Sequence, residues 1–245
     1  MTDSTISTAK NRANRREGSS LVSQVVQELR FLIREDGLKI GDTMPGEADI
    51  CERLGVSRSV VREAYKSMSA MRLIEVSNGR RARVAAIDNV VLALGMDHAV
   101  QVNQITVQQI LDVRRTIEMR TVSLAALLRA DRQAEEIASH AAQMRTDFHD
   151  AEKVMQHDIA FHEAIAQATR NPMFSMIVGS FHLVTRQTWQ TGWTARDSDA
   201  ARNASVDCHE AIAAAIKEKD AQQATTLMAA HFDDTVSVLL SNGIN

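Results

Sequence analysis

The fold of the first third of this 245-residue chain follows from one stretch, Leu54-Gly55-Val56-Ser57-Arg58-Ser59-Val60-Val61-Arg62-Glu63-Ala64. Gly55 suits the left-handed conformation that ends a helix, and the Ser57 hydroxyl is well placed to cap the helix that follows. A short helix is predicted over residues 47–54, directly before this turn. This order is typical of a helix-turn-helix, which consists of a short helix, a glycine-containing turn and a longer, capped helix. The second helix of such a motif enters the DNA major groove.

The segments on either side complete a winged helix-turn-helix over residues 20–87. Apolar residues recur at helical spacing from Ser20 onward and predict a first helix that ends at two glycines. Two short β-type runs, residues 73–76 and 82–85, flank Asn78-Gly79, a favoured pair for a two-residue hairpin turn. These runs predict a hairpin wing with arginines at its tip.

Five side chains of this domain have the chemistry to contact DNA. Arg58 can donate two hydrogen bonds to guanine, and Arg62, one turn further on, can reach a base or the backbone. Ser57 and Ser59 lie where free N–H groups and the positive end of the helix attract a phosphate. Arg80 places positive charge beside the wing turn. The alternatives are a protein-binding winged helix and a basic hairpin that is only solvated.

Composition changes near residue 88. Residues 1–87 hold 15 Lys and Arg against 11 Asp and Glu, whereas residues 88–245 hold 13 against 20 and all 8 histidines. The basic charge of residues 1–87, the front domain, favours a polyanion as partner. The acidic charge and the histidines of residues 88–245, which contain the back domain, favour a cation or a small ligand. We expect a disordered basic tail over 1–19, the DNA-binding domain over 20–87, a linker over 88–104 and an effector-binding and dimerisation domain over 105–245.

Several features point to a cytoplasmic protein with no membrane partner. No apolar run approaches the ~20 residues needed to span a bilayer, and the basic start leads into an amphipathic helix instead of a signal peptide. The 2 cysteines, Cys51 and Cys208, lie far apart and offer no disulfide framework.

The back domain is predicted to be an all-α antiparallel bundle, so the fold class is mainly α with one small β-hairpin in the winged domain. Only 2 prolines and 10 glycines interrupt the chain. The predicted helices cover 105–130, 132–149, 151–169, 172–191, 199–217 and 221–241, with breaks that include Gly192.

In the first of these helices, Arg114 falls on an apolar stripe. The stripe also contains Ile110, Val113, Ile117 and further apolar positions at helical spacing. A buried guanidinium needs an anion, and two alternatives remain open: an internal carboxylate such as Glu118, or the carboxylate of a ligand.

Four more polar residues lie on apolar faces of later helices. Asp158 and His162 are four residues apart on one face, whereas His209 and His231 each lie 11 residues from a predicted turn at Asp220. Both histidines therefore stand about 16 Å from the turn by the ~1.5 Å rise per residue. The four side chains form a ligand set suited to Zn, with Ni, Mn or Fe as alternatives. The competing interpretation is a set of hydrogen-bonded core residues.

The front domain resembles a known family. Gly41-Asp42-Thr43-Met44-Pro45-Gly46-Glu47, the stretch quoted above and Leu73-Ile74-Glu75 resemble the winged helix-turn-helix of the GntR family of bacterial transcription regulators. The resemblance implies DNA contacts from Ser57, Arg58, Ser59, Arg62 and the wing around Gly79.

The back domain is similar to the FCD effector domain of the FadR-like branch of that family. The similarity rests on Arg114-x-x-Ile117-Glu118, Ala125-Ala126, Asp158-x-x-x-His162, Asn171-Pro172 and the helices of His209 and His231. It implies that Asp158 and the three histidines bind a divalent metal ion at the floor of an effector pocket. It also implies that Arg114 contacts a carboxylate of the effector.

These observations predict a transcription regulator, of the repressor type, that binds palindromic double-stranded operator DNA as a homodimer and responds to a small organic acid. We expect no catalytic residues. The alternative is a metal-dependent hydrolase or oxygenase fused to a DNA-binding module, but the sequence has no His-Glu-x-x-His motif. A third possibility is nucleic-acid binding without sequence preference.

Overall fold

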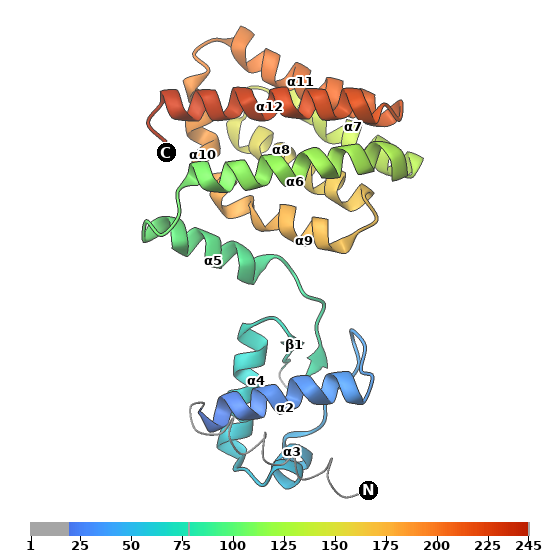
Figure 1. Cartoon of the computed structure of the whole chain (residues 1–245), viewed down its shortest axis with the longest axis vertical. Coiled ribbons are helices and arrows are strands. Elements are labelled where there is room, and N and C mark those ends of the chain that lie inside the picture. The colour runs from blue at the N-terminus through green and yellow to red at the C-terminus, as the bar shows by residue number, and fades with distance from the viewer. Residues whose placement is uncertain (1–19, 78, 245) are drawn as a thin grey trace, which may run out of the picture. The chain divides into compact units, whose positions relative to one another are not determined.

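A computed structural model describes residues 20–77 and 79–244. The chain divides into two compact units, Met1–Asp88 and Asn89–Asn245, which are coloured blue to teal and green to red in Figure 1. The tail predicted over 1–19 and Asn78 of the predicted hairpin turn lie outside the described residues.

The first unit contains three helices, α2 (Leu21–Glu35), α3 (Glu47–Leu54) and α4 (Arg58–Ala70). Ser20 caps α2 through a side chain that accepts a hydrogen bond from the Ser23 N–H. Gly55 ends α3 with a φ of 65°, and its N–H donates to the Cys51 carbonyl oxygen. Only a residue that tolerates this left-handed conformation allows α4 to begin three residues later.

The wing is a short antiparallel pair of β1 (Ile74–Glu75) and β2 (Arg83–Val84). Thr43 forms an isolated bridge to Arg83 on the other side of β2. The paired strands are shorter than predicted, and pairing ends at Glu75, so the connection is longer than a two-residue turn. Val76, the next residue, is 55% exposed and gains too little burial to extend the strand.

The core of the first unit packs α2, α4 and β1 around a few fully buried side chains. Fully burying such a side chain contributes about 1.5–3 kcal/mol. The largest are Leu29, Met44, Ile50, Met68 and Ile74.

The second unit is a helical bundle. Its helices are α5 (Val90–Gln101), α6 (Val107–Leu128), α7 (Asp131–Thr146), α8 (Ala151–Ala168), α9 (Pro172–Ser180), α10 (His182–Ala195), α11 (Asp199–Lys217) and α12 (Ala221–Ser241). The core lies between α6, α7, α8, α11 and α12, which Figure 1 shows side by side. No helix among the described residues is long and apolar enough to cross a membrane.

Three details of the second unit differ from the prediction. The segment expected as a linker over 88–104 contains α5. The helix predicted over 172–191 is two helices that meet at Phe181, and the second of them continues past Gly192 to Ala195. The predicted break at Gly192 is therefore wrong, because a glycine is tolerated inside a helix whose neighbours pack closely, here the Leu239 side chain of α12.

The buried face of α6 is rotated from the predicted stripe. Val113 is 52% exposed, although the stripe placed it inside, whereas Glu118 and Val122 are fully buried. The helix packs mainly against α12 and α8, so the neighbouring helices choose the buried face. Arg114 is buried as predicted.

Candidate metal centre and nucleic-acid interface

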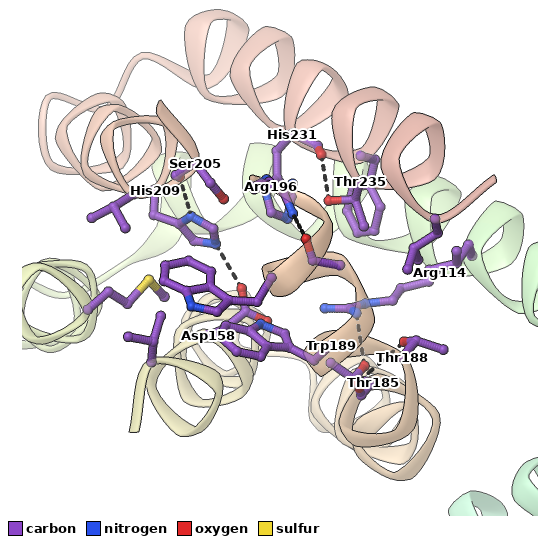
Figure 2. A pocket seen from close by; sticks show the side chains of 18 residues that line it. Arg114, Asp158, Thr185, Thr188, Trp189, Arg196, Ser205, His209, His231 and Thr235 are labelled. Atoms are coloured by element: carbon purple, nitrogen blue, oxygen red, sulfur yellow. Dashed lines mark hydrogen bonds and ion pairs between the residues drawn. The ribbon is translucent and has the colours of Figure 1, made fainter. Parts of the chain in front are cut away.

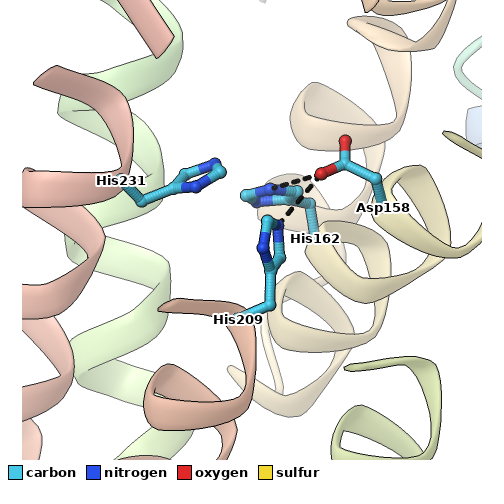
Figure 3. Close-up of side chains that lie close together, drawn as sticks. All are labelled: Asp158, His162, His209 and His231. Carbon is cyan, nitrogen blue, oxygen red and sulfur yellow. Dashed lines mark hydrogen bonds and ion pairs between the residues drawn. The ribbon is translucent and has the colours of Figure 1, made fainter. Parts of the chain in front are cut away.

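Asp158, His162, His209 and His231 come together in the middle of the second unit (Figure 3). Helix α8 carries Asp158 and His162 one turn apart, while α11 and α12 each carry one histidine. One ligand atom of each residue lies within 4.8 Å of the others. The sequence predicted this set, and the structure places it at one point.

The hairpin of α11 and α12 brings the two later histidines level. Helix α11 ends at Lys217 and α12 begins at Ala221, so the chain reverses where predicted. The ring centres of His209 and His231 lie 4.6 Å apart, and those of His162 and His231 lie 5.2 Å apart.

Hydrogen bonds to the outer nitrogens orient two of the imidazoles. The His209 Nδ1 lies 2.8 Å from the Ser205 carbonyl oxygen, and the His162 Nδ1 contacts a Glu118 oxygen. Each ring therefore presents its Nε2 to the cluster, as ligating histidines do when a second group fixes the tautomer.

The His162 Nε2 is buried and has no hydrogen-bond partner among the described residues. It lies 4.0 Å from an Asp158 oxygen, and the His209 Nε2 lies 3.0 Å from the same oxygen. Because an unsatisfied buried polar atom costs about 1–3 kcal/mol, the His162 Nε2 favours a cation in the cluster. The residues therefore fit a divalent metal ion.

The protonation states of the cluster suit a metal ion. Burial alone would raise the pKa of Asp158, but the His209 hydrogen bond and the nearby His162 and Arg114 hold that pKa below its ordinary value. Burial, followed by His209 and His162, holds the pKa of His231 well below its ordinary value. An ionised carboxylate and a neutral imidazole are the forms that bind metals.

Arg114 pairs with the internal carboxylate. Its Nε donates to Glu118 at 2.5 Å, and its Nη1 donates to the Thr185 hydroxyl at 2.9 Å. Glu118 thus joins Arg114 to His162, and these two partners offset the burial of its carboxyl and keep its pKa low. The sequence suggested Glu118 by its i,i+4 spacing but gave no signal for Thr185, which is 71 residues away.

Arg114, Asp158, His209 and His231 also line one pocket, so Arg114 is available to a ligand (Figure 2). The remaining wall comes largely from α10, through Thr185, Thr188 and residues further along the helix. The cavity has a volume of about 60 Å³. Sequence reasoning missed this wall.

The residues predicted to contact DNA are all exposed on the first unit. They are Ser57, Arg58, Ser59, Arg62, Gly79 and Arg80. Ser57 occupies the N-cap position of α4, but its hydroxyl makes no capping hydrogen bond and instead lies 2.9 Å from the Ser59 hydroxyl. The expected Ser57 cap is therefore not present, because the neighbouring hydroxyl is the partner.

Helix α4 and the wing border a groove of about 600 Å³. Its basic side chains are Arg62, Lys66, Arg80 and Arg81. The Arg62 Nε donates to Glu47 at 2.9 Å, an exposed ion pair that holds the guanidinium at the groove. Lys66 was not among the residues predicted to contact DNA, although its position one turn after Arg62 could have identified it.

Two protein families match the chain. Residues 21–84 match the family described as bacterial regulatory proteins, gntR family, and residues 109–234 match the FCD domain. The first match covers the helix-turn-helix and wing, and the second covers the cluster of Asp158 and the three histidines together with Arg114.

Individual relatives agree with these matches. The HTH-type transcriptional regulator LutR of Bacillus subtilis is 28% identical over 211 residues, which cover 85% of this chain and 96% of LutR. The galactonate operon transcriptional repressor of Escherichia coli is 27% identical, with 78% of this chain and 85% of the repressor covered. The structure of Streptococcus agalactiae GntR has the same fold, with a TM-score of 0.64 at 23% identity, and covers 88% of this chain and 99% of that one.

Proposed function

Because this chain belongs to the GntR family of bacterial transcription regulators and carries an FCD domain, we propose that it is a metabolite-controlled repressor. A small organic acid, bound at a divalent metal ion in the FCD domain, controls its affinity for operator DNA. The observation that carries the proposal is the cluster of four ligand atoms within 4.8 Å of one another.

The donor set favours zinc, with Ni, Mn or Fe as alternatives. Three imidazoles and one carboxylate are the nitrogen and oxygen ligands that these ions accept. The residues that would hold the ion are Asp158, His162, His209 and His231. The bound ion would supply positive charge and a coordination position for a carboxylate oxygen.

Arg114 supports an acid as the effector. Its guanidinium lines the pocket beside the cluster and keeps donors besides those used by Glu118 and Thr185. A carboxylate between Arg114 and the metal ion would be bound from two sides.

The proposed DNA interface is the start of α4 together with the wing. Ser57, Arg58, Ser59 and Arg62 would contact DNA in the major groove, with Gly79 and Arg80 at the backbone or minor groove. A homodimer would present two such surfaces to a palindromic operator. A cytoplasmic location is part of this proposal.

The relatives and the matched families are transcription regulators and not enzymes. The alternative of a metal-dependent hydrolase or oxygenase is therefore not adopted.

The experiment measures binding of the full chain to a duplex selected from a random library by the protein itself. Arg58→Ala should weaken specific binding by about 10–100-fold, since one bidentate base contact contributes about 1–3 kcal/mol. The double variant His209→Ala with His231→Ala should keep DNA affinity but lose metal and any response to organic acids. A double variant that still responds to an acid would refute the proposed effector site, and undiminished specificity in Arg58→Ala would refute the DNA interface.

A further inference from the structure

Trp189 and Trp193 form an aromatic wall of the pocket beside the metal cluster. The chain contains 2 tryptophans, and both line the pocket from α10. Their rings stack with centres 5.0 Å apart and planes 16° apart. Figure 2 shows Trp189 on the side of the pocket opposite His231 and Thr235.

Contacts with Phe148 and Arg202 hold Trp193, the inner residue of this wall, in place. Trp193 is 8% exposed, and the Phe148 ring meets it edge-on at 5.7 Å. The Arg202 guanidinium of α11 lies 5.9 Å from the Trp193 ring centre, while its Nε donates to the Trp193 carbonyl oxygen at 3.3 Å. Trp189, which is half-buried, stacks on this fixed ring and packs against the same core. Outward movement of the wall would therefore break several contacts.

The space that the wall leaves is small. The cavity volume is about 60 Å³. One water-sized group needs about 10–15 Å³ of cavity volume, so the pocket has room for roughly four to six non-hydrogen atoms. Ligand pockets for larger molecules usually have about 300–1,000 Å³.

We propose that the wall of Trp189 and Trp193 restricts the effector to a carboxylic acid of two or three carbons. A carboxylate and one further oxygen fill the space between Arg114, the metal cluster and the indoles, whereas a sugar acid collides with Trp189. This inference rests on the proposed function, because it assumes that an acid binds at this pocket.

The test compares two probe acids, two-carbon glycolate and six-carbon gluconate, by calorimetric titration of the zinc-loaded full chain. Glycolate should bind the wild-type protein at least tenfold more tightly than gluconate does. Trp189→Ala should raise gluconate affinity at least tenfold and change glycolate affinity by less than threefold. Gln190→Ala, on the exposed side of the same helix, is the matched control and should behave as the wild type does.

Fluorescence provides a second readout, since both indoles line the pocket. Glycolate should change the emission of the wild-type chain and of Trp189→Ala, which keeps Trp193. If Trp189→Ala fails to fold, as judged by thermal unfolding, Trp189→Leu makes the same comparison with a larger side chain. Equal affinity of the two acids for the wild-type protein would overturn the size restriction and leave the proposed function standing. Failure of both acids to bind the metal-loaded chain would contradict the proposed function, and the inference would fall with it.

Discussion

At the scale of single residues, Glu118 joins the two polar sites of the second unit. Its fully buried carboxylate accepts one hydrogen bond from the Arg114 Nε on one side and contacts the His162 Nδ1 on the other. An ionised group at this position is stabilised by Arg114 and by the contact with His162, which together outweigh the cost of burying it. Glu118 therefore orients both His162, a proposed metal ligand, and Arg114, the proposed contact of the effector.

Substituting Glu118→Gln should lower metal affinity by about 10–100-fold, the effect expected when the partner of a ligating histidine is lost. The amide keeps the shape but removes the charge that holds the His162 ring. Competition with a chromophoric chelator measures the affinity. Glu152→Gln, at an exposed position of α8, is the control. Equal metal affinity in wild type and Glu118→Gln would show that Glu118 does not orient His162.

Tyr65 gives a prediction about pH in the first unit. Burial, together with Glu47 and Asp49, raises the pKa of its hydroxyl from 10.0 to about 12. The unfolded chain loses this proton first, so the contribution of Tyr65 to folding stability should be constant below pH 10 and decline between about pH 10 and 12. Because the chain has 1 tyrosine, tyrosinate absorbance reports on Tyr65 alone.

In denaturant, the same titration should give the ordinary pKa of a tyrosine hydroxyl, 10.0. Tyr65→Phe should remove the alkaline decline and also lower stability by about 1 kcal/mol, since the Tyr65 hydroxyl donates to the Pro45 carbonyl oxygen. An absorbance midpoint near 10 in the folded protein would contradict this environment.

At the scale of elements, Arg129 ties the end of α6 to the end of α11. Its Nε donates to the Ile216 carbonyl oxygen at 3.3 Å, and a second nitrogen donates to the Lys217 carbonyl oxygen. Both carbonyls lie in the last turn of α11, where partners four residues further along run out, and the Ile216 carbonyl oxygen also accepts from the Lys219 N–H at 3.1 Å. Arg129 thereby holds α11 in place just before the chain turns toward α12.

Arg129→Ala should lower the free energy of unfolding of the second unit by about 1–3 kcal/mol, because the hydrogen bonds from the charged guanidinium to the Ile216 and Lys217 carbonyl oxygens are lost. Denaturant unfolding followed by circular dichroism measures the change. Arg132→Ala, three residues along on an exposed surface, should change stability by less than about 0.5 kcal/mol. Equal effects of the two substitutions would refute the structural role of Arg129.

The elements show where sequence reasoning succeeds. The bounds of α3 and the hairpin turn near Asp220 follow from local signals, a C-terminal glycine and a capping aspartate. The break between α9 and α10 lies at Phe181, which carries no breaker signal, while Gly192 looks like a break and is helical. Such positions depend on packing against other helices, and spacing along one helix does not contain that information.

For the candidate site in the second unit, the sequence identified the residues of the cluster but not the side chains that pair with them. The four residues proposed as metal ligands were identified because they are polar side chains at apolar positions, and burying them without partners would be costly. The pairing of His162 with Glu118 and of Arg114 with Thr185 joins helices distant in sequence. The tryptophan wall was missed because it depends on the course of α10, which the predicted break at Gly192 disrupted.

At the scale of the whole molecule, α5 links the pocket to the chain that leaves the first unit. Helix α5 begins at Val90, directly after the unit Met1–Asp88 ends. The Gln187 amide of α10 donates to Asp97 of α5, and α10 carries the pocket wall. A ligand that moves α10 can therefore move α5, which is the condition for coupling between the two binding events.

Gln187→Ala should leave metal and acid binding intact but reduce the effect of the acid on DNA affinity severalfold, within the 5–150-fold range typical of such coupling. Anisotropy titrations of labelled duplex with and without glycolate measure the ratio of affinities. Arg186→Ala, the exposed neighbour, is the control. An unchanged ratio in Gln187→Ala would show that coupling does not pass through this contact.

Elemental analysis of the purified full chain tests whether Asp158 and the three histidines bind a metal ion. The wild-type protein should contain close to one divalent metal ion per chain, and the variant that combines His209→Ala with His231→Ala should contain none. Wild-type protein that contains no metal, and that takes up none from a zinc-containing buffer, would contradict this proposal.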